Sequence, residues 1–221
     1  MHSCQSVMER VALIEAPGER GLRHERLIEA VQACQRCPTM DGRRRVLGRT
    51  NGPPDARVMF IAEAPGRRGG EVTGVPLTRD QSGRRFAHLL ALAGLTRARV
   101  FITNAVLCNP RRPNGANRPP SAAEVRACSG WLRAQIALID PLVVVTLGAT
   151  ALRALALIEP YPYRLRDCVA QPLPWNGRIL VPLYHPSPRA GLSRSYREQE
   201  ADFARLRDIL AGLPAYRVAQ G

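Results

Sequence analysis

The amino-acid sequence predicts an α/β fold: one domain in which a central four-stranded parallel sheet lies between two layers of helices, a three-layer α/β/α sandwich. Two observations predict it. Short apolar runs alternate with helix-like segments along most of the chain, an order typical of parallel sheets covered on both faces. The length of 221 residues suits a single domain. We expect residues 1–221 to form this domain, with residues 1–33 as an N-terminal helical segment.

Four apolar runs are predicted to be strands, because each is short and ends in polar or turn-forming residues, as strands buried on both faces do. Functional groups in such sheets gather where strands end. The segments AEAPG, NAVLCNP and YHPSPRAG each follow or close one of these runs, so we expect the functional site there. The runs are ARVMFIA (56–62), RVFITNAVL (99–107), LVVVTLG (142–148) and RILVPLY (178–184).

About five segments are predicted to be helices. The segment 82–94 has apolar residues at helical spacing and ends at Gly94, a C-cap residue. The segment 121–139 opens with a capping box formed by Ser121 and Glu124. The remaining helices are expected at ATALRALALI (149–158), at RLIEAVQAC (26–34) and at REQEADFARLRDILAGL (197–213).

The composition predicts a polyanionic partner. The formal net charge is +14, and all 32 residues of the Lys and Arg class are arginine. Such a charge favours nucleic acid, with a membrane surface as the alternative. No run reaches the roughly 18 apolar residues of a membrane span. The first ten residues, MHSCQSVMER, lack the basic flank and apolar core of a signal peptide. We therefore expect a soluble cytoplasmic monomer.

The cysteine spacing predicts a metal site. Cys34 and Cys37 form a C-x2-C pair, and Cys108 and Cys128 flank the basic loop between residues 109 and 120. Six cysteines in a cytosolic chain argue against a disulfide scaffold. Four thiolates suit zinc or an iron–sulfur cluster equally well on ligand chemistry alone. The other two cysteines, Cys4 and Cys168, are expected to be ordinary thiols.

Four motifs, taken together and in this order, resemble the uracil-DNA glycosylase superfamily from about Ala33 to Leu210. They are AEAPG (62–66), TGVPLTRDQSG (73–83), NAVL (104–107) and HPSP (185–188). AEAPG resembles the first motif of the iron–sulfur, family 4 type, whereas TGVPLTRDQSG is more similar to the family 5 branch. The resemblance implies a monofunctional DNA glycosylase that hydrolyses the N-glycosidic bond of flipped deoxyuridine in single- or double-stranded DNA. It leaves an abasic site, as in base excision repair.

The resemblance also assigns the residues that bind the base. Asn104 would read uracil, because one amide can donate to O4 and accept from N3–H, and Ala64 and Gly66 would line the base site. His185 would donate to O2, where negative charge builds as the bond breaks, with the flanking prolines stiffening its loop. The alternative for His185 is a structural histidine at a strand end.

Two carboxylates compete to orient the attacking water. Asp80 matches the family 5 pattern and Glu63 the family 4 pattern, and we favour Asp80 for the water and a supporting role for Glu63. A carboxylate can also stabilise the cationic sugar. The alternative for Asp80 is an N-cap of the following helix. Leu77 stands where relatives that excise uracil carry a stacking aromatic residue, which opens the specificity to other deaminated bases such as hypoxanthine or xanthine.

The resemblance further implies how DNA and the metal are held. Arg189 stands where relatives often carry an apolar wedge, and Ser187 lies beside it. The arginines of the basic loop are expected to grip phosphates; they are Arg111, Arg112 and Arg118. The four cysteines are expected to bind a structural 4Fe-4S cluster rather than zinc. The alternatives are a metal-containing DNA-binding module without catalysis and a redox iron–sulfur protein.

Overall fold

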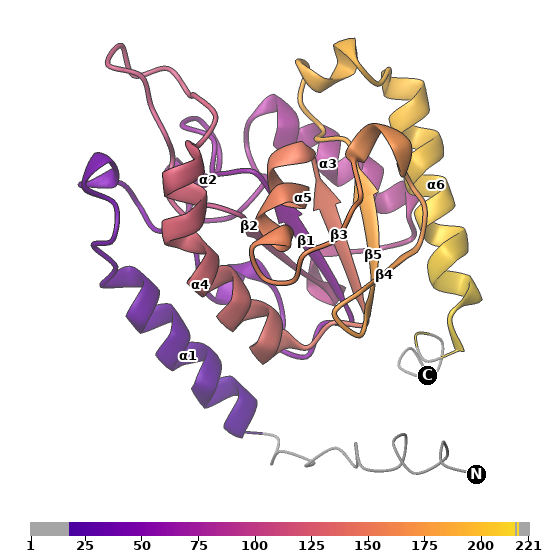
Figure 1. The fold of residues 1–221 in the computed structure, drawn as a ribbon, viewed down its shortest axis with the longest axis horizontal. Helices are drawn as coiled ribbons and strands as arrows, with labels where there is room; N and C mark the ends of the chain where they lie inside the picture. The colour runs from indigo at the N-terminus through magenta and orange to yellow at the C-terminus, as the bar shows by residue number, and fades with distance from the viewer. Residues whose placement is uncertain (1–17, 215, 217–221) are drawn as a thin grey trace.

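The computed structural model describes residues 18–214 and residue 216. The expectations for the first ten residues and for Cys4 lie outside the described residues. A five-stranded sheet in the order β2-β1-β3-β5-β4 forms the centre of the molecule (Figure 1). All pairs are parallel except β4 with β5. The strands are β1 (Val58–Ala62), β2 (Val100–Asn104), β3 (Val143–Leu147), β4 (Leu173–Trp175) and β5 (Arg178–Leu183).

The four predicted parallel strands are confirmed, but the expected count was short by one. The additional strand β4 pairs antiparallel with β5 at the edge of the sheet. It is three residues long and contains Pro174, so no apolar periodicity marks it. Its signal is instead the dipeptide Asn176–Gly177, in which both residues have positive φ, 47° and 68°. Such a pair closes a two-residue hairpin.

The predicted helices are also confirmed, although the first of them begins at Glu19, seven residues before the expected start. The capping box of Ser121 and Glu124 is present at the start of α4. Four residues form an additional short helix, α2 (Gly70–Thr73), in the loop after β1. None of the helices among the described residues has the length and apolar character needed to cross a membrane. The long helices are α1 (Glu19–Gln32), α3 (Gln81–Leu92), α4 (Ala122–Ile139), α5 (Ala149–Ala156) and α6 (Tyr196–Gly212).

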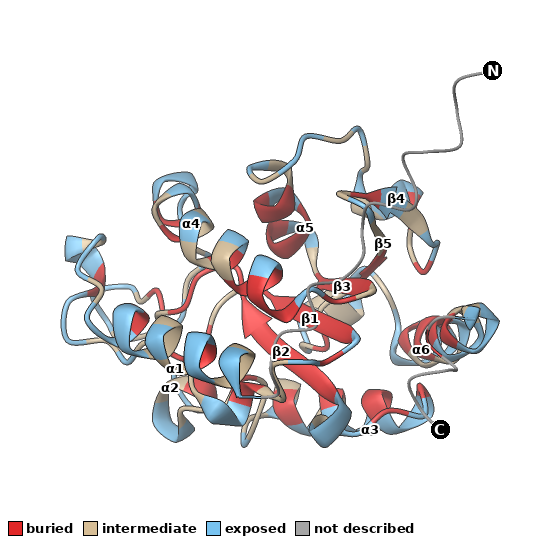
Figure 2. Ribbon diagram, turned by 90° about the horizontal axis from the view of Figure 1, so that it is seen from below, coloured by how far each residue is buried: buried red, intermediate tan, exposed pale blue. Residues whose placement is uncertain are grey.

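Alternate residues of each strand face different helical layers. Met59 and Ile61 of β1 pack into a core with residues of α1, α4 and α5. Phe60 and Ala62 pack into a second core with residues of α3 and α6. The buried strands lie between these helices in Figure 2. Because apolar burial stabilises a fold by roughly 25 cal/mol per Å², both faces of the sheet drive folding, and the three-layer sandwich is confirmed.

The strand order reverses at β1, which marks one edge of the sheet as the place where a ligand is expected. After β1 the chain builds β2 on one side, and later β3 on the other side of β1. In open α/β sheets, ligands bind outside the carboxyl ends of the strands at such a reversal. The loop that precedes α4 projects on this side of the molecule (Figure 1). The segments AEAPG, NAVLCNP and YHPSPRAG follow β1, β2 and β5, so all three lie at the edge where a ligand is expected.

Candidate active site

His185 and Asp80 come together at the carboxyl edge of the sheet. His185 follows β5, and Asp80 is the N-cap of α3. Burial lowers the pKa of His185 to about 4, and the negative charge of Asp80 acts in the opposite direction. The imidazole is therefore neutral near pH 7, and a neutral imidazole donates from one ring nitrogen and accepts at the other.

Two features hold His185 in place. Gly148, at the exit of β3, has φ +97°, and a Cβ added there would lie 3.4 Å from Cβ of His185. The histidine loop is closed by a hydrogen bond of 2.8 Å from the backbone N–H of Ser187 to the carbonyl of His185. The Ser187 hydroxyl accepts a further bond from the N–H of Ala190. The loop is thus ordered by its own backbone, beside the end of β3.

One of the two carboxylate oxygens of Asp80 is used within the fold. Its Oδ1 accepts a hydrogen bond of 2.8 Å from the N–H of Gly83, so the N-cap interpretation is confirmed. Its Oδ2 lies over two glycines: a Cβ on Gly66 would be 2.7 Å from Oδ2, and one on Gly69 only 2.6 Å. No described residue donates a hydrogen bond to Oδ2. Capping therefore uses one carboxylate oxygen and leaves the other for a ligand or water.

Asn104 ends β2 with an unsatisfied amide. The side chain is 2% exposed, and its Nδ2 has no hydrogen-bond partner among the described residues. A buried donor without a partner costs about 1–3 kcal/mol. Val100 and Ile102 point to the same face of β2 as Asn104, because side chains two residues apart in a strand share a face. Both pack on the α3 and α6 side of the sheet. Asn104 thus belongs to the face on which Asp80 caps α3.

Glu63 faces the opposite layer. Its Oε2 accepts a hydrogen bond of 2.7 Å from the hydroxyl of Thr150 in α5, a helix that packs on the other face of the sheet. Arg153 donates to the same hydroxyl at 3.2 Å. Glu63 directly follows β1 and Thr150 lies in the helix that follows β3, so the bond joins the exits of these two strands.

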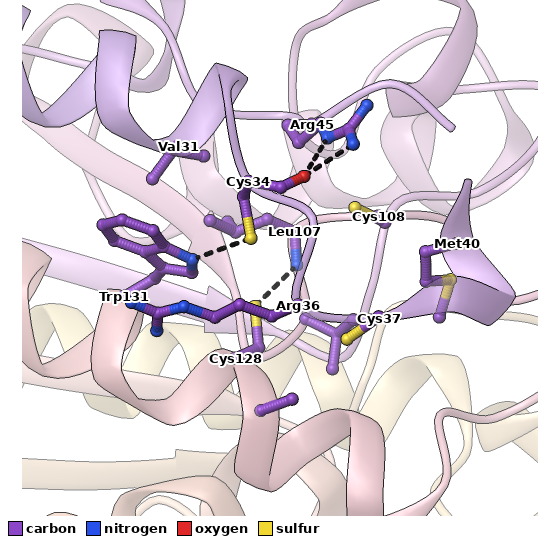
Figure 3. Close-up of a pocket in the computed structure, with 12 residues that line it drawn as sticks. Val31, Cys34, Arg36, Cys37, Met40, Arg45, Leu107, Cys108, Cys128 and Trp131 are labelled. Atoms are coloured by element: carbon purple, nitrogen blue, oxygen red, sulfur yellow. Dashed lines mark hydrogen bonds between the residues drawn. The ribbon is translucent and has the colours of Figure 1, made fainter. Parts of the chain in front are cut away.

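The four predicted metal ligands line one cavity. Cys34, Cys37, Cys108 and Cys128 surround a space of about 30 Å³ between the end of α1, the exit of β2 and α4 (Figure 3). All four are free thiols, as is Cys168, which lies elsewhere. Cys4 is outside the described residues. Segments separated by up to 94 residues in sequence thus converge on a single group of sulfur atoms.

Hydrogen bonds position two of these sulfurs. The indole N–H of Trp131 donates to Sγ of Cys34 at 3.2 Å, and the backbone N–H of Leu107 donates to Sγ of Cys128 at 3.4 Å. Arg45 fixes the C-x2-C loop by donating to the carbonyl of Cys34 at 2.6 and 3.1 Å (Figure 3). Motif reasoning missed Trp131 and Arg45, because neither belongs to a ligand pattern.

The surroundings of the thiols disfavour free thiolates. Burial raises the pKa of Cys37, raises that of Cys108 to about 11 and raises that of Cys128 to about 12. Metal binding deprotonates such thiols by supplying positive charge. Among the described residues, no three Cys, His, Asp or Glu side chains are placed to hold a single metal ion.

Comparison with known proteins decides the family. The model of the uracil DNA glycosylase superfamily matches residues 50–210. The chain belongs to this superfamily. A type-4 uracil-DNA glycosylase of Thermotoga maritima is 36% identical over 165 residues, covering 72% of this chain and 79% of that protein. A type-5 uracil-DNA glycosylase of Thermus thermophilus is 31% identical over 195 residues, covering 74% of this chain and 86% of that protein. The resemblance inferred from the motifs is confirmed, including its mixture of the two types.

Within this member of the superfamily, the basic loop is tied to the rest of the fold. The amide of Asn109 is buried and donates to the carbonyl of Pro65 at 2.5 Å. Asn117 accepts from that amide and from the N–H of Arg67. The AEAPG loop is therefore held by the loop that follows β2, a contact that the motifs alone did not indicate.

Two of the three arginines predicted to grip phosphates are paired with carboxylates in this structure. Arg111 binds Glu71, and Arg118 makes two bonds to Glu124, at 2.6 and 2.7 Å. The bonds from Arg118 lower the pKa of Glu124 to about 2. Arg112 is exposed, and no acidic side chain in the described part of the chain pairs with it.

Glu124 links the cysteine loop and the basic loop. Besides binding Arg118 and the N–H of Ser121, it accepts a hydrogen bond of 2.9 Å from Thr39, two residues after Cys37. The cysteine loop, the basic loop and the start of α4 therefore meet at one carboxylate. The capping-box pattern located Glu124, but only the fold shows its other partners.

The remaining predicted residues lie near the histidine loop or before α3. Arg189 is exposed at the start of a short 3₁₀ helix, Ala190–Leu192. Leu192, three residues further on, is 90% exposed, an apolar side chain that the motifs did not single out. Leu77 packs against the core formed with α3 and α6, with φ 50°. Ala64 is half-buried against the opposite core.

Proposed function

We propose that this chain is a DNA glycosylase that hydrolyses the N-glycosidic bond of flipped deoxyuridine and leaves an abasic site in DNA. One observation carries the proposal. His185, which is neutral near pH 7, lies close enough to Asp80 to be influenced by its charge, and Asn104 on the same side of the sheet keeps a buried amide donor without a partner among the described residues. The names of the type-4 and type-5 relatives support uracil as the substrate.

Asn104 reads the base. Uracil presents an acceptor at O4 and a donor at N3, and an amide matches both when Nδ2 donates and Oδ1 accepts. Binding would remove the cost of the unsatisfied donor. Cytosine presents the reverse pattern and would leave two buried groups mismatched. Flipping brings this edge of the base into the pocket.

His185 stabilises the leaving base. Negative charge develops on O2 as the glycosidic bond breaks, and the neutral imidazole donates a hydrogen bond to it. Removing one such donor typically lowers the rate by about 10²–10³-fold. A cationic imidazole would donate too, but the depressed pKa of His185 keeps the ring neutral at physiological pH.

Asp80 orients the water. Asp80 caps α3, which lies on the same face of the sheet as Asn104, whereas Glu63 bonds to Thr150 in the opposite layer. Oδ2 of Asp80 can accept a proton from water while its charge stabilises the cationic sugar. Glu63 supports the site by joining the exits of β1 and β3.

The reaction ends at the abasic site. Cleavage of the sugar-phosphate backbone by a bifunctional glycosylase needs an amine that forms a Schiff base. The chain contains no lysine. Water is therefore the nucleophile, and the DNA strand stays intact until alkali or another enzyme cuts it.

The base specificity follows from Leu77. An aromatic residue at this position would contribute about 1–3 kcal/mol by stacking on the base. Leu77 provides an apolar contact without a π face, and its side chain packs against the core. We propose that uracil is bound more loosely than by an aromatic-bearing enzyme, and that hypoxanthine or xanthine is the second candidate substrate.

We further propose that the four cysteines hold a 4Fe-4S cluster. Soft thiolates are its ligands, and hydrogen bonds to the sulfurs are common around such clusters. Zinc, which four thiolates bind at about 2.3 Å from one ion, is the alternative. When bound, the cluster would cross-link α1, the exit of β2 and α4 through iron–thiolate bonds.

Oligonucleotide cleavage tests the proposed activity. A labelled strand with one deoxyuridine, alone or paired, is incubated with the protein and then heated in alkali. Strand breakage only after alkali is expected, and parallel strands with hypoxanthine or xanthine rank the bases. Intact strands for all three bases would refute the proposal and leave a DNA-binding module without catalysis.

A further inference from the structure

An arginine-rich groove opens beside Asp80, and none of the roles above uses it. Its volume is about 580 Å³. Asp80 is its only acidic lining residue. The groove lies between the loop after β1 and the start of α3. Its lining residues are Arg67, Arg68, Val72, Arg79, Asp80, Gln81 and Arg84.

The arginines of this groove are free to meet a ligand. All four are exposed, and within residues 18–214 no acidic side chain forms an ion pair with Arg67, Arg68 or Arg79. Arg84 donates to the carbonyl of Arg79 at 2.9 Å. Arg111 and Arg118 differ from them, because each is paired with a carboxylate. These arginines therefore offer positive charge to a polyanion that reaches the groove.

The backbone fixes where these arginines stand relative to the reaction. Arg67 follows the AEAPG loop, and its N–H donates to Asn117 at 3.1 Å. Arg79 directly precedes Asp80 and has φ 65°, a left-handed conformation that the loop imposes. Arginines from two loops thus line the same groove as the carboxylate proposed to orient the water. A polyanion bound to them would pass beside the reacting sugar.

We propose that this groove binds the phosphates that flank the flipped deoxyuridine in a DNA strand. The proposal rests on the proposed function and assigns DNA contacts to Arg67, Arg68 and Arg79. Guanidinium groups bind phosphates through paired N–H donors. Phosphate contacts fix the register of a strand without reading its sequence. Holding the backbone on both sides of one nucleotide offsets part of the few kcal/mol that unstacking costs.

The salt dependence of binding tests the groove. Binding of a fluorescent uracil-free single strand is measured by anisotropy at several salt concentrations. The variant Arg67→Gln/Arg68→Gln/Arg79→Gln is compared with Arg57→Gln/Arg126→Gln/Arg164→Gln, which removes the same charge from exposed arginines outside the groove. Each phosphate contact on single strands contributes about 0.7 to the slope of log K against log salt.

The slope should fall by roughly 2 in the groove variant, if each arginine holds one phosphate, and should stay near the wild-type value in the control. Equal slopes in the two variants would overturn the proposal even if the wild-type protein excises uracil. A wild type that binds with a groove-dependent slope but excises no base would instead overturn the proposed function alone. If the triple variant has a lowered melting temperature, Arg67→Gln and Arg79→Gln are measured singly against Arg57→Gln. Each should then change the slope by half the triple variant's expected change or less.

Discussion

Oδ2 of Asp80 lies 2.6 Å from the position that a Cβ on Gly69 would occupy. Real Cβ atoms do not approach an oxygen so closely, so this carboxylate can take its position only because residue 69 is glycine. The same added atom would lie 2.6 Å from the carbonyl of Thr78. The loop after β1 therefore sets the position of a carboxylate that belongs to the start of α3.

Replacing Gly69 by alanine should lower the turnover of uracil DNA. The added methyl group pushes Asp80 away, and a misplacement of about 1 Å can cost 10²-fold in rate. Because the N-cap is disturbed, we also expect a loss of about 1 kcal/mol in stability. Gly21→Ala is the matched control, since a Cβ there has no atom within 4 Å. Full activity of Gly69→Ala would show that the position of Oδ2 does not matter for the reaction.

Substitution by the isosteric amides distinguishes the roles of Asp80 and Glu63. Asp80→Asn keeps the cap, because Asn and Asp are equally good N-cap residues, but it removes the charge beside the sugar. We expect excision to fall by about 10²–10⁴-fold with unchanged melting and DNA binding. Glu63→Gln should retain most of the activity, since its amide can still accept from Thr150. The opposite ranking of the two variants would assign the water to Glu63.

His185 should make stability depend on pH in a defined window. Its pKa is about 4 in the folded protein and about 6.5 in an unfolded chain. Between these values the unfolded state binds more protons, so stability is present above pH 6.5 and falls as the pH drops towards 4. His185→Gln should flatten the melting temperature against pH in this window. His88→Gln, which removes an exposed histidine paired with Glu200, is the comparison, and equal curves for wild type and His185→Gln would contradict the assignment.

The sequence was sufficient for the parts of this fold that local patterns encode. Buried apolar runs located β1, β2, β3 and β5, and the capping box located the start of α4. The motifs named Asp80, Asn104 and His185, and the fold places Asp80 near His185 and on the face to which Asn104 belongs. The strands, the capping box and the motifs each depend on residues close together in sequence, so they can be predicted without knowledge of the tertiary structure.

Long-range pairs could not be predicted in the same way. Arg111 meets Glu71 across 40 residues, and no spacing rule distinguishes a paired arginine from a free one. Asp80 and Gly69 meet because two loops fold against each other, which requires the tertiary structure. The predicted phosphate contacts of Arg111 and Arg118 assumed unpaired side chains, and no local pattern shows that both are paired with carboxylates.

Removing Cys34 should destabilise the protein and abolish the proposed cluster. A cluster held by three of four thiolates is exposed at one iron, so Cys34→Ser should lose the brown colour and the bound iron and sulfide. We expect a lower melting temperature and weaker DNA binding, because the cysteine loop is joined through Thr39 and Glu124 to Arg118. Cys168→Ser, at a cysteine outside the cavity, should keep its metal. An unchanged melting temperature, DNA affinity and iron content in Cys34→Ser would contradict the proposed cluster.

Leu192 should matter for duplex DNA and not for single strands. Its side chain is 90% exposed on the loop that carries His185, and apolar wedges inserted between base steps are a common means of unstacking a duplex. Leu192→Ala should therefore slow excision of uracil from a duplex by about tenfold, equivalent to about 1.4 kcal/mol, while excision from a single strand stays unchanged because no hole needs filling. Leu22→Ala removes another exposed leucine, 62% exposed on α1, and should affect neither substrate. Arg189→Ala separates the two candidates for the wedge: if it produces the duplex-specific loss and Leu192→Ala does not, the arginine takes the place of the base and the leucine has no part in flipping.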